Sequence, residues 1–170
     1  ALAAHLGGPL LLSTNTALSQ ATATELTRTL APGATVYLLG GEKALAPAVE
    51  TAVQKLGFST KRLAGADRFS TSVDIATTMA ADMRDVNGHP AVQRVLLATG
   101  INFPDALAAG TAAGATPDTV LVLTNDAQMP AATSTFVKTW AGTATGANVY
   151  PVGGAANKAA KTLTGTVPAG

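Results

Sequence analysis

The chain contains no cysteine among its 170 residues, and it is poor in charged and aromatic side chains. Without cysteine there is no disulfide framework, no thiolate metal site and no cysteine nucleophile. Charged residues make up 12% of the chain, aromatic residues make up 4%, and the formal net charge is +1. So small a net charge gives no broad basic field, which argues against generic binding to nucleic acid. No apolar run approaches the ~18 residues of a membrane span, so we expect no membrane segment.

Alanine, threonine and glycine are abundant instead and together fill nearly half of the chain. Hydrophobic residues reach 47%, which excludes a disordered polyelectrolyte and indicates a folded, weakly charged protein. The sequence starts at Ala1 without a methionine or a signal peptide. We therefore expect a processed product or a piece of something longer.

Short apolar runs alternate with longer segments of helical periodicity along the whole chain. The expected strands cover residues 9–13, 35–39, 58–64, 92–99, 120–123 and 148–152. The expected helices cover about 19–30, 43–56, 69–84, 104–113, 130–140 and 155–163. The runs lack a period of two and are followed by helices, which predicts parallel strands covered on both faces. The sequence therefore predicts an α/β protein whose parallel sheet units are Rossmann-like or toprim-like.

An internal repeat organises these elements. Three pairs of segments match in order: 1–4 with 106–109, 10–15 with 121–126, and 36–41 with 149–154. The offset between matched positions grows from 105 through 111 to 113, so one unit is slightly longer than a hundred residues. We expect residues 1–61 to be the C-terminal half of one unit and residues 62–170 to be a second, nearly complete unit.

Several segments of this repeat resemble the cell wall binding repeat 2 family. Residues 62–73, Arg-Leu-Ala-Gly-Ala-Asp-Arg-Phe-Ser-Thr-Ser-Val, resemble the opening signature of the family. Residues 99–109, Thr-Gly-Ile-Asn-Phe-Pro-Asp-Ala-Leu-Ala-Ala, resemble its central signature. The apolar triplets at 10–12 and 121–123, and the paired glycines after residues 39 and 152, also fit the family pattern. The resemblance covers almost the whole chain, in order and at the family's spacing.

The resemblance implies a secreted module that anchors proteins on the surface of Gram-positive bacteria without being an enzyme. Members of the family usually carry three tandem repeats around a pseudo-threefold axis. The implied partners are an anionic wall polymer, such as a cell-wall polysaccharide or a teichoic-acid-like polymer, and other copies of the repeat. Those copies would lie in tandem or form a homo-oligomer, a trimer included. Pro151 and the text Ala-Ala-Asn-Lys at residues 155–158 depart from the pattern, which weakens that strand end as a site or makes it a capping unit.

The candidate polymer-binding residues lie where the expected strands end. Open parallel sheets bind ligands beyond the carboxyl ends of their strands. Glycine there lets a ligand approach the backbone, and the following helix offers free N–H groups. The alternative is that such turns need Gly, Ser, Thr and Asn in any case, and for any single turn this alternative is favoured. The candidates are Gly40, Gly41, Arg68, Thr71, Thr99, Gly100, Asn102, Asp105, Thr124, Asn125, Gly153 and Gly154.

Two arginines and two aspartates lie near these strand ends. Arg68 could bind a phosphate or carboxylate of the polymer through two parallel hydrogen bonds, or it could form an internal ion pair with Asp67 or Asp105. For Arg62 the structural role is favoured. Asp105 follows a proline at the expected start of a helix, where its carboxylate complements the helix dipole. That role is favoured over a catalytic one.

The sequence gives little support for catalysis. Neither His5 nor His89 has the spacing of a zinc ligand or a neighbouring nucleophile, and the carboxylates are scattered. There is no Gly-x-Gly-x-x-Gly and no P-loop motif, so we expect no catalytic residue, no metal and no cofactor. Two alternatives stay open: an α/β enzyme fragment with its catalytic residues elsewhere, and a structural oligomerisation module. The alanine-rich segments 1–8 and 106–115 favour association of units through close backbone packing.

Overall fold

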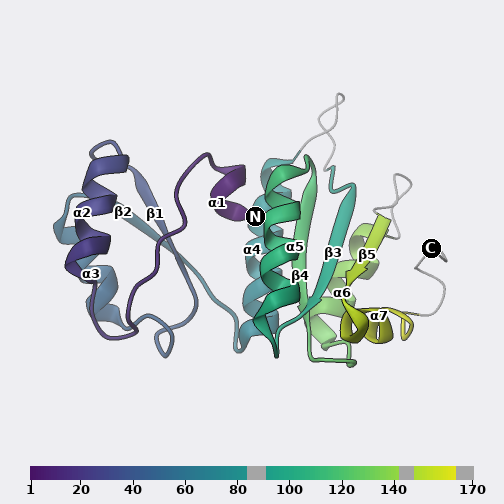
Figure 1. Ribbon diagram of the computed structural model, residues 1–170. Coiled ribbons are helices and arrows are strands. Elements are labelled where there is room, and N and C mark those ends of the chain that lie inside the picture. Colours follow the sequence, from purple (N-terminus) through teal and green to yellow (C-terminus); the bar gives the residue numbers. More distant parts are fainter. Residues whose placement is uncertain (84–90, 142–147, 164–170) are drawn as a thin grey trace.

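The structure is a computed structural model and describes residues 1–83, 91–141 and 148–163 (Figure 1). Its strands are β1 (Thr35–Leu39), β2 (Ser59–Leu63), β3 (Arg94–Thr99), β4 (Thr119–Thr124) and β5 (Asn148–Val152). Its helices are α1 (Leu2–His5), α2 (Gln20–Thr29), α3 (Pro47–Lys55), α4 (Arg68–Asp82), α5 (Phe103–Ala115), α6 (Ala131–Ala141) and α7 (Gly154–Ala160). All three strand pairings are parallel, which confirms the predicted α/β fold.

The larger sheet has the strand order β4-β3-β5, so β3 lies at its centre. On one face, Val95 and Leu97 of β3 are fully buried in a cluster built with α4, α6 and α7. On the other face, Leu96 and Ala98 pack against α5. Because both faces of β3 are covered, its sequence is a continuous apolar run and does not alternate.

The smaller sheet pairs β1 with β2, and the two sheets share α4. On one face of the smaller sheet, Val36 packs with a cluster formed by α2, α3 and Phe58. Tyr37 and Leu39 point to the other face and pack against the cluster that contains α4 residue Met79. Figure 1 shows α1 and α4 between the two sheets. Helix α4 therefore joins the two units through one continuous core.

The segment 9–13 is not a strand, contrary to the sequence prediction. Leu10 is 69% exposed and Leu12 is 84% exposed. The repeat counterpart of this segment is β4, which forms because β3 offers it a backbone ladder. Segment 9–13 pairs with none of the described strands, so its backbone joins no ladder, and the Leu12 carbonyl accepts from the Thr22 hydroxyl at 2.6 Å instead.

Most other elements lie close to their expected positions, and the differences have local causes. Helix α3 starts at Pro47 and not near residue 43, because Leu45 belongs to a turn whose carbonyl accepts a hydrogen bond from Arg62. Helix α4 ends at Asp82, and the expected helix end at residue 84 lies outside the described residues. A proline occupies the first turn of α5, as predicted.

Candidate functional site

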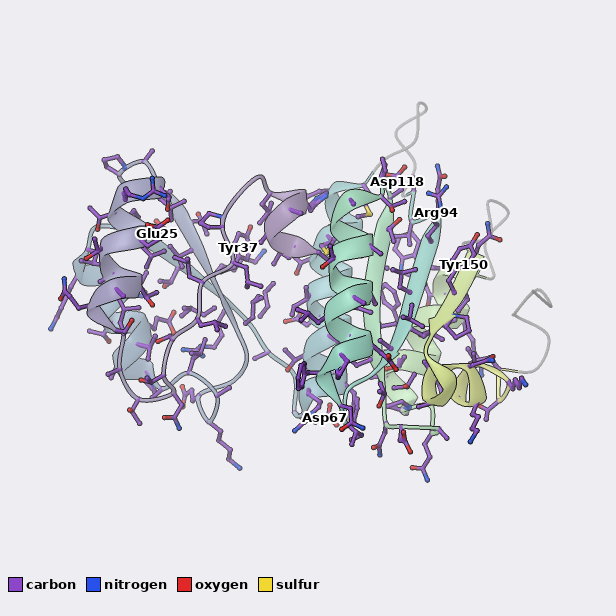
Figure 2. The ribbon with its side chains drawn as sticks, viewed as in Figure 1. Glu25, Tyr37, Asp67, Arg94, Asp118 and Tyr150 are labelled. Carbon is purple, nitrogen blue, oxygen red and sulfur yellow. The ribbon has the colours of Figure 1, made fainter. Side chains whose placement is uncertain are left out.

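The carboxyl ends of β3, β4 and β5 meet at one edge of the larger sheet because the three strands are parallel. The Gly100 N–H donates to the Thr124 carbonyl at 2.8 Å, which joins the ends of β3 and β4. Helices α4 and α5 also begin at this edge, where Figure 2 labels Asp67. The fold therefore brings together the candidate residues of the second unit.

Arg68 in the first turn of α4 lies across the end of β3. Its Nη1 donates to the Gly100 carbonyl at 2.7 Å, and the side chain is exposed. A Cβ at position 100 would lie 3.1 Å from Phe69 and 3.3 Å from the Cδ of Arg68, so a glycine fits this approach best. Among the described residues Arg68 forms no ion pair, so the alternative of an internal ion pair with Asp67 or Asp105 is not observed.

Asp67 fixes the start of α4. Its Oδ1 accepts from the Ser70 backbone N–H at 2.7 Å, while the Asp67 N–H donates to the Ser70 hydroxyl at 3.0 Å. This is a capping box, which satisfies backbone donors that the first helical turn leaves free. The Ser70 amide, and then its hydroxyl, lower the pKa of the Asp67 carboxyl from its ordinary value. The carboxylate is thus committed to the helix that presents Arg68.

Three candidate threonines use their hydroxyls inside the protein. Thr71 accepts from the Gly65 N–H at 3.0 Å, and Thr99 accepts from the Ile101 N–H at 3.2 Å. Thr124 donates to the Asp126 carbonyl at 3.0 Å and is 0% exposed, while Thr99 is 3% exposed. These side chains shape the turns at the edge, and the last two do not face solvent.

The two candidate asparagines lie in different turns at the same edge. Asn102 precedes α5, is exposed, and makes no side-chain bond to the helix start. Asn125 exchanges backbone hydrogen bonds with Gln128, at 3.0 and 2.9 Å, in a tight turn after β4. Asn102 therefore offers a free amide at the surface, while the Asn125 backbone closes its turn.

Asp105 lies against the end of β5. A Cβ at Gly153 would overlap the Asp105 carboxylate, and Gly153 has a φ of 85°. Both observations call for glycine at this position, since other residues rarely adopt positive φ. Gly154 follows as the first residue of α7 and is exposed. Asp105 lies in the first turn of α5, as predicted, and its carboxylate also packs against the β5–α7 turn.

The edge of the smaller sheet differs because its arginine is fully engaged. Arg62 donates from Nη1 to the carbonyls of Gly40 at 2.8 Å and Leu45 at 2.9 Å, and from Nη2 to Glu50 Oε2 at 2.9 Å. Arg62, followed by Thr60, lowers the pKa of the Glu50 carboxyl through hydrogen bonds. Gly40 is buried, and Gly41, which follows it in the same turn, is half-buried. Arg62 takes the structural role favoured for it.

Sequence reasoning missed two exposed apolar side chains beside Asn102. Ile101 in the turn after β3 is 50% exposed, and Phe103, the first residue of α5, is 78% exposed. Their position between glycine, asparagine and proline is a signal of a surface turn that could have identified them.

Metal and membrane features are lacking in the part of the chain that the structure describes. No group of three histidine or acidic side chains there could hold a metal ion. No described helix is long and apolar enough to cross a membrane. His5 lies 3.9 Å from Asp82 in a loose pair, and His89 lies outside the described residues.

Two parallel α/β units that share a helix, with polar strand ends at their edges, define a repeat module. The sequence matches the family Cell wall binding domain 2 (CWB2) over residues 1–50 and 62–162, and the chain belongs to this family. Its fold is similar to that of Cwp6 from Clostridium difficile, with a TM-score of 0.78 and 22% identity over 98% of this chain. The chain spans 25% of the length of Cwp6. No curated protein sequence matches it.

Proposed function

We propose that this chain is a non-catalytic module that holds a secreted protein on the bacterial surface by binding an anionic polymer of the cell wall. Membership of the Cell wall binding domain 2 family supports wall binding. The observation that favours an anionic ligand is Arg68, whose exposed guanidinium gives one hydrogen bond to Gly100. Its other N–H donors have no partner among the described residues, and such donors match the paired oxygens of a phosphate or carboxylate.

The neighbours of Arg68 suit a polymer that carries both charge and sugar. Asn102 offers a neutral amide, and Phe103 offers an exposed aromatic face at the same strand end. A cell-wall polysaccharide or a teichoic-acid-like polymer combines anionic groups with sugar or polyol units. In this proposal Thr99 and Thr124 stabilise the turns at the strand ends. The ligand contacts Arg68, Asn102, Asn125 and the Gly153–Gly154 turn.

Acidic side chains limit how strongly the edge attracts anions. Asp67, Asp105 and Asp126 all belong to the turns or first helical turns around Arg68. The chain as a whole carries a net charge of only +1. Binding must therefore depend on local contacts, and we expect only a weak dependence of affinity on ionic strength.

We further propose that residues 1–61 are the C-terminal half of one repeat and that residues 62–170 form a second. In this proposal the second repeat carries the open edge, because Arg62 engages the strand end of the first. Other copies of the repeat are the expected protein partners, in tandem or as a homo-oligomer, a trimer included.

Co-sedimentation with purified cell walls of a Gram-positive bacterium tests this function. The chain is expected to pellet with intact walls and to stay in the supernatant when the anionic polymers have been stripped from the walls. Failure to pellet with intact walls at low salt would contradict wall binding. Equal pelleting with intact and stripped walls would contradict the anionic polymer. Stable oligomers without pelleting would identify a structural assembly module instead.

A further inference from the structure

The carboxylates at the open edge of the larger sheet differ in whether they have an internal partner. Asp67 accepts from the Ser70 amide in the capping box of α4. Asp105 packs against the β5–α7 turn, where a Cβ at Gly153 would overlap its carboxylate. Asp126, in the turn after β4, is exposed, and its carboxylate forms no hydrogen bond or ion pair with the described residues. The Asp126 carboxylate is therefore free to bind a ligand.

A chain of hydrogen bonds fixes Asp126 relative to Arg68. Arg68 Nη1 donates to the Gly100 carbonyl at 2.7 Å, and the Gly100 N–H donates to the Thr124 carbonyl at 2.8 Å. The Thr124 hydroxyl in turn donates to the Asp126 carbonyl at 3.0 Å. Asp126 is also held at a φ of 50°, which residues other than glycine seldom adopt. Two exposed groups of opposite charge thus lie at neighbouring strand ends without pairing with each other.

Opposite charges that are held apart in this way suit a ligand that carries both signs of charge. A guanidinium binds phosphate or carboxylate oxygens, and a carboxylate accepts hydrogen bonds from an ammonium group. A ligand with negative charge alone would be attracted by Arg68 but repelled by Asp126. The net charge of +1 provides no broad basic surface to offset that repulsion. An ammonium group on the ligand would turn the repulsion into a second contact.

We propose that Asp126 binds an ammonium group that lies beside the anionic group bound by Arg68, so that the ligand is a zwitterionic polymer of the cell wall. The inference rests on the proposed function and narrows its ligand class. Anionic polymers whose repeating units also carry an amine bind, and those without an amine bind more weakly. A repeating unit with both charges also agrees with the weak dependence on ionic strength expected for this edge.

The turn that carries Asp126 does not need its negative charge. Backbone hydrogen bonds between Asn125 and Gln128, and the bond from the Thr124 hydroxyl to the Asp126 carbonyl, hold this turn without the carboxylate. Asparagine, like aspartate, tolerates a positive φ, and the matched position of the first unit is Asn15. Asp126→Asn therefore removes the charge and keeps the turn.

Asp118 provides a matched control at the opposite edge of the same sheet. It has a φ of 52° and directly precedes β4, and Figure 2 shows it at the end of the sheet away from Asp67. Its carbonyl accepts from the N–H groups of Gln93 at 2.9 Å and Arg94 at 3.1 Å, so its backbone holds the turn. Asp118→Asn thus makes the same change in charge at a similar backbone conformation, far from the candidate site.

Two small phosphodiesters test the proposal on the intact chain. Glycerophosphoethanolamine and glycerophosphoglycerol each carry a single negative charge on phosphate, and the first also carries an ammonium group. Each is titrated into the ¹⁵N-labelled chain and into the Asp126→Asn and Asp118→Asn variants. The chemical shifts of the Arg68 Nε–H group and of the Asp126 amide then give a Kd for each probe.

The unmodified chain and Asp118→Asn are expected to bind glycerophosphoethanolamine about threefold more tightly than glycerophosphoglycerol, as one exposed charge pair would give. In Asp126→Asn the two probes are expected to bind equally.

Equal binding of both probes to the unmodified chain would overturn the proposal and leave an anionic polymer as the ligand. A preference that persists in Asp126→Asn would overturn it as well, because another group would then bind the ammonium. Shifts with neither probe would also overturn it, and pelleting of the unmodified chain with walls decides separately on wall binding.

Discussion

The apolar triplet at residues 10–12 and its counterpart at 121–123 have nearly the same sequence but different structures. The second triplet lies in β4 and is paired along its length with β3. The first is paired with no strand among the described residues, and Leu12 is 84% exposed. The comparison shows that these residues become a strand only where a partner strand supplies the ladder.

The two arginines at the strand ends differ in the same way. Arg62 is surrounded by acceptors and engages Glu50 and two backbone carbonyls. Arg68 holds one carbonyl and is otherwise open to solvent. At the edge of the smaller sheet Arg62 therefore stabilises the fold, whereas Arg68 at the edge of the larger sheet is available to bind a ligand.

The largest expected effect is a difference in stability loss between a substitution in the central strand β3 and one in the unpaired segment 9–13. Leu97→Ala removes a fully buried side chain from the central strand and is expected to lower the free energy of unfolding by about 3 kcal/mol. Leu12→Ala removes a side chain exposed to solvent and is expected to change it by less than about 0.5 kcal/mol. Urea denaturation of the two variants measures both values. Similar losses would show that the Leu12 side chain is packed in solution.

The next comparison is between Leu2 in α1 and Leu107 in α5, which occupy equivalent positions of the matched segments 1–4 and 106–109. Leu2→Ala is expected to lower the free energy of unfolding by about 2 kcal/mol, at the low end of core truncations because α1 is short. Leu107→Ala is expected to cost less than about 0.5 kcal/mol in the isolated chain. The same denaturation experiment measures the pair. If Leu107→Ala lowered the free energy of unfolding as much as Leu2→Ala, the face of α5 that carries Leu107 would have to be covered already.

The third comparison is between the losses in free energy of unfolding that Arg62→Ala and Arg68→Ala cause. Arg62→Ala leaves Glu50 and two carbonyls without their donor and is expected to cost about 2 kcal/mol. Arg68→Ala removes one exposed hydrogen bond and is expected to cost less than about 1 kcal/mol. Thermal and urea unfolding measure the difference. A larger loss for Arg68→Ala would assign it a structural role.

The smallest expected effect is the pH dependence contributed by Glu50. Hydrogen bonds from Arg62 and Thr60 lower the pKa of its carboxyl from the ordinary value of 4.5. The unfolded state therefore binds protons first, so this stabilisation is complete above the ordinary pKa and is lost as pH falls through the lowered one. Glu50→Gln is expected to flatten the decline of stability as the pH falls below the ordinary carboxyl pKa of 4.5. An unchanged decline would mean that Glu50 contributes little.

Much of the fold could be predicted from the sequence because its signals are local. The apolar run 94–99 is continuous, and Pro104 and Asp67 mark the starts of their helices. The failure at segment 9–13 has a non-local cause, since nothing within that segment reveals whether a partner strand is present. The continuous core around α4 likewise depends on tertiary packing that periodicity does not encode.

The sequence allowed the site to be placed at the carboxyl edge of the parallel sheet, but it did not show which candidate residues are exposed there. Parallel topology brings the strand ends together, so Arg68 and Gly100 could be expected near each other. The burial of Thr99 and Thr124 depends on which elements cover the ends of their strands. The exposure of Phe103 depends on how α5 packs against the sheet. Neither follows from residue type or spacing.

Wall pelleting of two charge-matched variants tests the central claim most directly. Arg68→Gln and Arg28→Gln make the same change in net charge, but Arg28 lies on α2 and pairs with Glu25 at 2.7 Å, away from the larger sheet. The account predicts that Arg68→Gln loses most of its pelleting with intact walls, while Arg28→Gln pellets like the unmodified chain. Equal pelleting of the two variants would contradict the account, because net charge or another surface would then carry the binding.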